Sequence, residues 1–188
     1  LYAYIYGTGQ AEAARELAAQ LGIQPDDAVA VRGPALPSAA VSLADVDREK
    51  RQKVEYGRKI WEKTKGVTPS SPVEKYLRGR GITVPIPASI RMAELVHPDD
   101  RSCLYPCMVA PMQVGRSITG VHRTYLSWDG GKAKLPVLSK KHVPRVKLML
   151  GQAEVAAVRL GPLGPNLAIG EGIETSLSIA SLAPGWTV

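Results

Sequence analysis

The chain has 188 residues, of which 45% are hydrophobic, and 24 lysines and arginines against 17 acids give it a formal charge of +7 and a pI near 9.5. This length can bury the core of one domain, or of one and a half. The charge suits a polyanionic partner such as nucleic acid or nucleotide phosphates, although a soluble protein that happens to be cationic stays an alternative. With no apolar run of roughly 20 residues and no secretory signal, we expect a cytoplasmic protein without membrane contact.

The first 41 residues predict a strand and a helix followed by a linker. An apolar start without an initiator methionine indicates a segment of a longer protein. Alanines and leucines then share one face of a helix from Gln10 to Leu21, which Gly22 ends. Residues 24–41 hold three prolines without a steady hydrophobic period, which is typical of a linker.

Two helices are predicted next, each from a capping signal. Ser42, with Asp45 three positions on, predicts the start of a long polar helix that runs to about Lys63. Ser71, Pro72 and Glu74 predict a short helix from Pro72 to about Arg78. After it, Arg78 and Arg80 alternate with glycines, so two guanidinium groups could meet phosphate oxygens. The alternative is that the glycines merely end the helix and both arginines are solvated.

An antiparallel β-rich block follows the helices. The pattern predicts strands over Leu104–Val114 and Ser117–Ser127, joined by a turn at Gly115, with a second hairpin turn over Trp128–Gly131 and a third strand beyond it. Cys103 stands just before the first of these strands and Cys107 within it, and we expect both to be buried thiols rather than zinc ligands.

A basic segment comes after the second hairpin. It contains six cations with almost no acid between them, which are Lys132, Lys134, Lys140, Lys141, Arg145 and Lys147. Such a segment could hold a template backbone or the triphosphate of a nucleotide. A solvated hairpin rim is the alternative, because cationic turns are frequent on any basic surface.

The most informative segment is Asn166–Ser178. It predicts a short buried strand, a glycine-flanked turn that carries Glu171, and a helix, after which Gly185–Val188 begins a parallel strand. A carboxylate at the carboxyl end of such a strand can meet hydrated Mg²⁺ and the phosphates it carries. The alternative is that Glu171 and Glu174 only favour the positive end of the helix dipole. The overall expectation is an α+β protein with a helical N-terminal segment, an antiparallel basic subdomain and the start of an α/β sheet.

The run Gly170–Ser178 resembles the first acidic motif of Toprim domains, the catalytic fold shared by bacterial-type primases, some topoisomerases and some nucleases. The resemblance implies that Glu171 is catalytic and a ligand of Mg²⁺ or Mn²⁺, with an Asp-x-Asp pair that lies outside this chain. Many relatives have an acid where this chain has Thr175, and Glu174 stands one place earlier, so the resemblance gives Glu174 no role.

Further stretches in three regions of the chain resemble primases. Residues 4–23 are similar to the tail of the zinc-binding module that precedes the catalytic region, which implies upstream Zn²⁺ ligands. Residues 59–62 and 76–82 resemble the lead-in to the Toprim region of plasmid- and phage-type primases and primase-helicases. Residues 115–126 and 131–134 resemble the family's basic subdomain, which implies that Arg123, Lys132 and Lys134 contact the polyanion.

The resemblance implies a domain order of zinc-module tail (1–23), linker (24–41), basic subdomain (42–150) and truncated Toprim domain (151–188). The implied activity of the parent protein is RNA primer synthesis on single-stranded DNA from nucleoside triphosphates, in company with a replicative helicase, and the fragment alone is expected to be inactive. Two alternatives stay open: a non-catalytic single-stranded nucleic-acid-binding module of a helicase, and a Toprim nuclease or topoisomerase.

Overall fold

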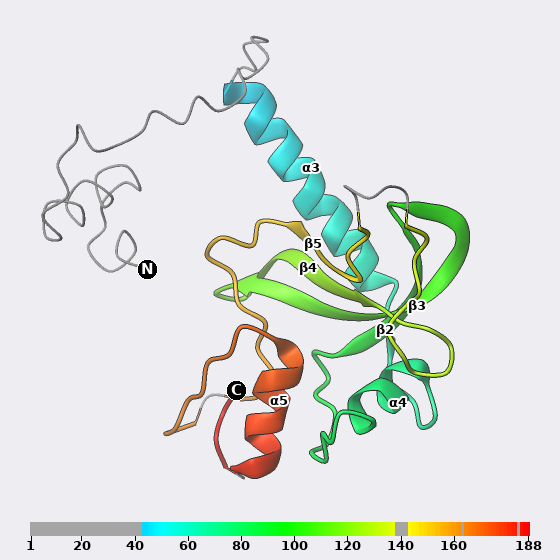
Figure 1. Ribbon diagram of the computed structural model, residues 1–188. Helices are drawn as coiled ribbons and strands as arrows, with labels where there is room; N and C mark the ends of the chain where they lie inside the picture. The colour runs from blue at the N-terminus through cyan, green and yellow to red at the C-terminus, as the bar shows by residue number, and fades with distance from the viewer. Residues whose placement is uncertain (1–42, 138–142, 163, 184) are drawn as a thin grey trace, which may run out of the picture. The chain divides into compact units, whose positions relative to one another are not determined.

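The computed structural model describes residues 43–137, 143–162, 164–183 and 185–188 (Figure 1). The strand and helix predicted in residues 1–23, the linker over 24–41 and the cations Lys140 and Lys141 lie outside these ranges. Residues from Val41 onward belong to one compact unit, and the description below concerns that unit.

The described residues form an α+β structure with three helices and one five-stranded antiparallel sheet, which confirms the predicted fold class. In chain order the elements are α3 (Leu43–Glu62), β1 (Lys65–Gly66), α4 (Pro72–Arg78), β2 (Arg91–His97), β3 (Asp100–Val114), β4 (Ser117–Tyr125), β5 (Lys147–Gly151) and α5 (Ile173–Leu182). The strands lie in the order β1-β2-β3-β4-β5, each antiparallel to its neighbour. None of the helices in the described ranges is long and apolar enough to cross a membrane.

Helix α4 begins and ends where its sequence signals predict. Ser71 is its N-cap and accepts a hydrogen bond from the Glu74 amide at 3.4 Å, with Pro72 at the first helical position. The helix stops at Arg78, and Gly81 continues the chain with a φ of 75° that glycine tolerates at no steric cost.

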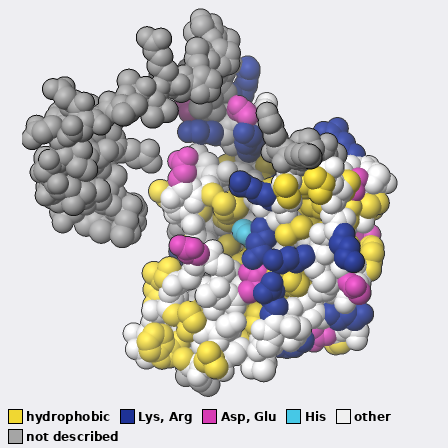
Figure 2. Space-filling model, viewed as in Figure 1, with side chains coloured by type: hydrophobic (Ala, Val, Ile, Leu, Met, Phe, Trp, Pro, Cys, Tyr) yellow, Lys and Arg dark blue, Asp and Glu magenta, His cyan; other side chains and the backbone are white. Residues whose placement is uncertain are grey.

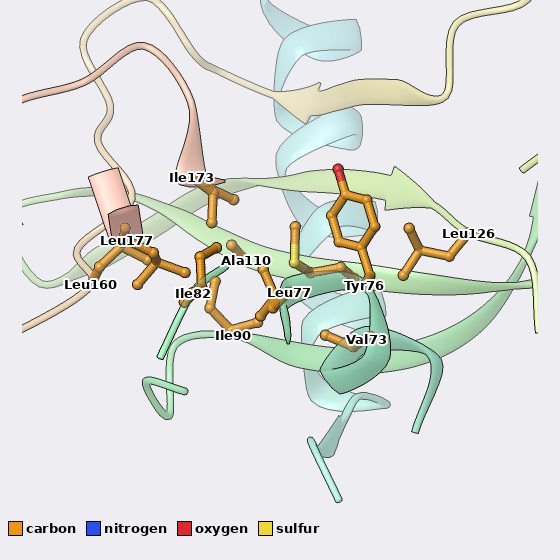
Figure 3. Close-up of a cluster of buried hydrophobic side chains, with 11 residues drawn as sticks. Val73, Tyr76, Leu77, Ile82, Ile90, Ala110, Leu126, Leu160, Ile173 and Leu177 are labelled. Carbon is orange, nitrogen blue, oxygen red and sulfur yellow. The ribbon is translucent and has the colours of Figure 1, made fainter. Parts of the chain in front are cut away.

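Side chains alternate along each strand, and part of each face of the sheet is buried. On one face Val109, Val121 and Tyr125 pack with Ile60 of α3. On the other face Met108, Ala110 and Leu126 form a second core with α4 and α5, and Figure 3 shows most of its members converging between the helices and the sheet. Helices α3 and α5 therefore cover opposite faces of the sheet (Figure 1).

The C-terminal residues contain the predicted β-α-β arrangement in a minimal form. Leu167 and Thr187 form an isolated parallel bridge, in which the Ala168 amide donates to the Thr187 carbonyl at 2.8 Å and the Thr187 amide to the Asn166 carbonyl at 2.9 Å. Helix α5 connects these two segments and packs Ile173 and Leu177 into the core. The turn that carries Glu171 thus follows a parallel-paired segment, as the sequence predicts. The expectation of a buried strand is wrong, because the pairing is a single bridge and Leu167 and Ile169 are 55% and 88% exposed.

The expectation for the cysteines is half wrong. Cys107 is fully buried beneath α3, but Cys103 is exposed, because the first residues of β3 project beyond the helices that cover the sheet further along.

Candidate functional site

The turn before α5 presents one exposed carboxylate, that of Glu171. Gly172 is the N-cap of α5, with extended backbone and no side-chain hydrogen bond to the cap among the described residues. A Cβ added to Gly170 would stand 2.7 Å from the Ser176 hydroxyl oxygen, so this glycine permits a close approach of the turn to the helix. The Glu171 side chain therefore stands at the positive end of the helix, free to meet solvent or a ligand.

Glu174, one helical turn into the motif, has a role that the sequence did not reveal. The residue is buried, with 8% of its surface exposed. The Tyr76 hydroxyl of α4 donates to one carboxylate oxygen at 2.6 Å, and the Lys147 ammonium of β5 donates to the other at 2.8 Å. One carboxylate thus joins α5, α4 and the edge strand of the sheet.

The ionisation of this cluster is fixed by its hydrogen bonds. Burial opposes the charged form of Glu174, but the bonds from Lys147 and Tyr76 outweigh it and lower the pKa of the carboxyl to about 2. Burial, followed by the bond to Glu174, raises the pKa of the Tyr76 hydroxyl to about 12. Glu174 is therefore a carboxylate at neutral pH, and Tyr76 is a neutral donor.

Two more side chains border this cluster. The Arg80 guanidinium lies over the Tyr76 ring, 5.1 Å from its centroid. His122 lies on the same sheet face as Thr124, the register partner of Lys147, and its Nδ1 is buried with no hydrogen-bond partner in the described part of the chain. Burial, with the nearby Lys147 charge, lowers the pKa of His122, so its ring is neutral at neutral pH. We call Glu174, Tyr76, Lys147, Arg80 and His122 the polar cluster.

The predicted polyanion contacts fall in different places. Lys132 and Lys134 are exposed on the hairpin after β4 and flank the buried Ala133. Arg80 belongs to the polar cluster. The Arg78 guanidinium is already engaged, since it donates to the carbonyls of Ile82 at 2.7 Å and Val84 at 2.9 Å.

Arg123 lies apart from the other predicted contacts. The residue is 8% exposed, and its side chain points to the α3 face, where it donates to the Tyr125 hydroxyl at 3.2 Å. Val121 and Tyr125, two residues before and after Arg123 in β4, lie in the core against α3. Because side chains alternate along a strand, this pattern could have predicted the burial of Arg123. A contact between Arg123 and a polyanion would require that face to open.

Charge on the surface is concentrated. Figure 2 shows Lys and Arg side chains gathered across the middle of the viewed face, with acidic side chains among them.

In the residues that the structure describes, no group of three or more His, Cys, Asp or Glu could hold a metal ion. Glu171 fits a metal as a single oxygen ligand, which is a common number for Mg²⁺ bound together with substrate phosphates. Glu174 does not fit, because Lys147 and Tyr76 occupy both of its oxygens.

A family model described as "Domain of unknown function (DUF7146)" matches residues 51–160, and the chain belongs to this family. The match includes most of α3, helix α4 and the whole sheet, and it ends before the turn that carries Glu171. No curated protein and no solved structure gives a significant match.

Proposed function

We propose that the parent protein is a Toprim-type DNA primase of the plasmid or phage kind, which synthesises RNA primers on single-stranded DNA by metal-dependent nucleotidyl transfer. The observation that best supports this is the anchoring of the acidic turn to the basic sheet. Glu174 binds Lys147 at 2.8 Å, and this bond ties the start of α5, which follows Glu171 in the chain, to the edge strand β5.

The reaction would join a primer 3′-hydroxyl to the α-phosphate of a nucleoside triphosphate, with pyrophosphate as the leaving group. Bound Mg²⁺ or Mn²⁺ supplies charge neutralisation at the phosphates. In this chain Glu171 would contribute one ligand to that metal, and further carboxylates would come from residues outside it. Arg80, Lys132 and Lys134, which are exposed, would attract the triphosphate and the template backbone.

The remaining assignments belong to this proposal. They are single-stranded DNA and nucleoside triphosphates as partners, a replicative helicase as a further partner, a Zn²⁺ module upstream of Leu1, and the cytoplasm as the location. Residues 42–150 would be the basic subdomain, and 151–188 the opening part of the Toprim domain.

A non-catalytic single-stranded nucleic-acid-binding module is the second candidate. One observation favours it: the family match covers the basic sheet and ends at residue 160, before Glu171. In that case Glu171 would merely favour the N-terminal end of α5.

Glu171→Gln in the full-length protein separates the two candidates. With a single-stranded template, labelled ribonucleotides and Mg²⁺, we expect primer synthesis to fall by about tenfold or more, because the amide is a far weaker metal ligand than the carboxylate. Binding of single-stranded DNA should stay unchanged. The matched control is Glu154→Gln, which neutralises an exposed acid outside the turn.

Wild-type rates in Glu171→Gln would contradict the metal role. Absence of primer synthesis by the wild-type protein, with DNA binding intact, would favour the binding module. Strands that shorten rather than lengthen would assign the Toprim-like turn to cleavage.

A further inference from the structure

Trp128 is a large apolar side chain held in solvent, with 56% of its surface exposed, at the tip of the hairpin that follows β4. The hairpin tip is well ordered by its own bonds. The Gly130 amide donates to the Ser127 carbonyl at 3.0 Å, and the Ser127 amide donates to the Gly131 carbonyl at 2.9 Å. Asp129 accepts from the Gly131 amide at 3.0 Å and from the Ser127 hydroxyl, so the acid at the tip is engaged within the turn.

The hairpin tip is also fixed against α4. Gly130 has a φ of 92°, and a Cβ added there would lie 2.4 Å from the Cβ of Lys75 and 3.2 Å from the amide nitrogen of Tyr76. This contact leaves no room for the tip to move toward the helix. It also places the exposed Lys75 side chain next to the hairpin, whose return segment carries the exposed Lys132 and Lys134.

Helix α4 links this hairpin to the polar cluster. Tyr76, the neighbour of Lys75, bonds Glu174 at 2.6 Å, and Arg80 stacks over the Tyr76 ring. Lys147 reaches the same carboxylate from β5. A series of exposed cations therefore runs from the hairpin across α4 to the polar cluster at the start of α5, consisting of Lys134, Lys132, Lys75 and Arg80.

From this arrangement we infer that Trp128 is a stacking platform for a base of single-stranded nucleic acid, whose backbone follows the cations across α4 toward Glu171. An exposed indole beside a track of positive charge has the two features that single strands use, since bases stack on aromatic rings and phosphates meet Lys and Arg. A duplex keeps its bases stacked inside and cannot use the indole in this way. The inference rests on the proposed function and names the surface that would receive the template.

The direct test is the affinity of the 188-residue chain for a fluorescently labelled oligothymidylate, measured by anisotropy at fixed salt. Trp128→Ala should weaken binding by about tenfold, and Trp128→Phe by less, because phenylalanine keeps a smaller ring for stacking. The matched control is Tyr56→Ala, which removes an aromatic ring that is 60% exposed on α3, on the other side of the sheet. Unchanged affinity in Trp128→Ala would overturn the inference.

Tryptophan fluorescence gives an independent readout. Oligothymidylate should quench the emission of the wild-type chain, and Trp128→Phe should lose most of that quenching while Trp61 and Trp186 remain. Equal quenching in both proteins would place the bound strand elsewhere and contradict the inference. A matched duplex, which offers charge without free bases, should leave the Trp128 emission unchanged.

The track of cations is tested by Lys132→Gln. Loss of one phosphate contact should weaken binding about equally for all base compositions and reduce the slope of log affinity against log salt by about 1. An unchanged slope would remove Lys132 from the track.

These outcomes are separable from those of the proposed function. If Trp128→Ala loses affinity while the full-length protein makes no primers, the stacking platform stands and the primase assignment fails. If the full-length protein makes primers and Trp128→Ala binds as tightly as wild type, the platform alone is wrong.

Discussion

Glu174→Gln is expected to lower the free energy of unfolding by about 2 kcal/mol, because it removes the charged partner of Lys147 from a largely buried site. Glutamine can still accept the Tyr76 hydrogen bond, so the loss falls mainly on the contact between α5 and β5. Lys147 keeps 38% of its side chain in solvent, which screens the pair and keeps the effect below that of a fully buried ion pair. Urea unfolding at neutral pH measures this loss of unfolding free energy.

The same substitution should make the free energy of unfolding depend less on pH in acid. The carboxyl of Glu174 has a pKa of about 2 in the folded protein against an ordinary value of 4.5, so the unfolded state binds the proton more readily. The stabilisation it gives is fully present above pH 4.5 and is lost as the pH falls toward 2. The difference in unfolding free energy between wild type and Glu174→Gln should shrink over that window.

The control for this prediction is Glu55→Gln. Glu55 pairs with Lys59 on the exposed side of α3 at 2.9 Å, with 66% of its side chain in solvent, and such pairs contribute little. We expect no measurable change in the free energy of unfolding at neutral pH. In acid, the variant should lose stability as the wild type does. If Glu174→Gln retained the full acid sensitivity, the carboxylate would not be paired as described.

Local signals predicted the parts of the fold that depend on neighbouring residues. The Ser71 cap and Pro72 fixed the start of α4, and Gly115 with the alternating pattern around it gave the hairpin between β3 and β4. Strands β2 and β5 were not predicted individually. The sequence Arg91–His97 lacks a clean apolar alternation because only part of each face is covered, and β5 is defined by its pairing with β4 rather than by its own composition.

In the candidate site, too, the sequence predicted the residue with a local signal and missed the one whose partners are distant in the chain. Glu171 was predicted because its signal is local, a carboxylate between two glycines before a helix. Glu174 was missed because its partners are Tyr76 and Lys147, which are 98 and 27 residues away in sequence and meet it only in the folded sheet. The burial of Arg123 could have been predicted, since Val121 and Tyr125 point to the same face of β4 and are core residues.

Gly151→Ala is expected to cost about 4 kcal/mol of unfolding free energy, the largest effect of any substitution considered, from backbone strain and overpacking together. Gly151 ends β5 with a φ of 107°, and an added Cβ would lie 2.3 Å from the Thr119 carbonyl oxygen and 2.6 Å from the Cα of Gly120. These are backbone atoms, which cannot rotate away as a side chain can.

Helix α3 prevents the sheet from relaxing around that clash. A Cβ on Gly57 would be 3.3 Å from the Gly120 Cα, so the helix already touches β4 at this point, and Arg58 fastens it by donating to the Ile118 carbonyl at 2.8 Å. Thermal unfolding measures the effect. The control is Gly161→Ala, where an added Cβ meets nothing within 4 Å and stability should hold or rise slightly.

A stability of Gly151→Ala close to that of wild type would mean that β5 does not approach β4 as described. If the strand is displaced instead, Lys147 at its other end moves away from Glu174, and the two substitutions then remove the same contact. The double variant Gly151→Ala, Glu174→Gln should therefore lose less unfolding free energy than the sum of the single losses, because residues that act through one shared contact are not additive.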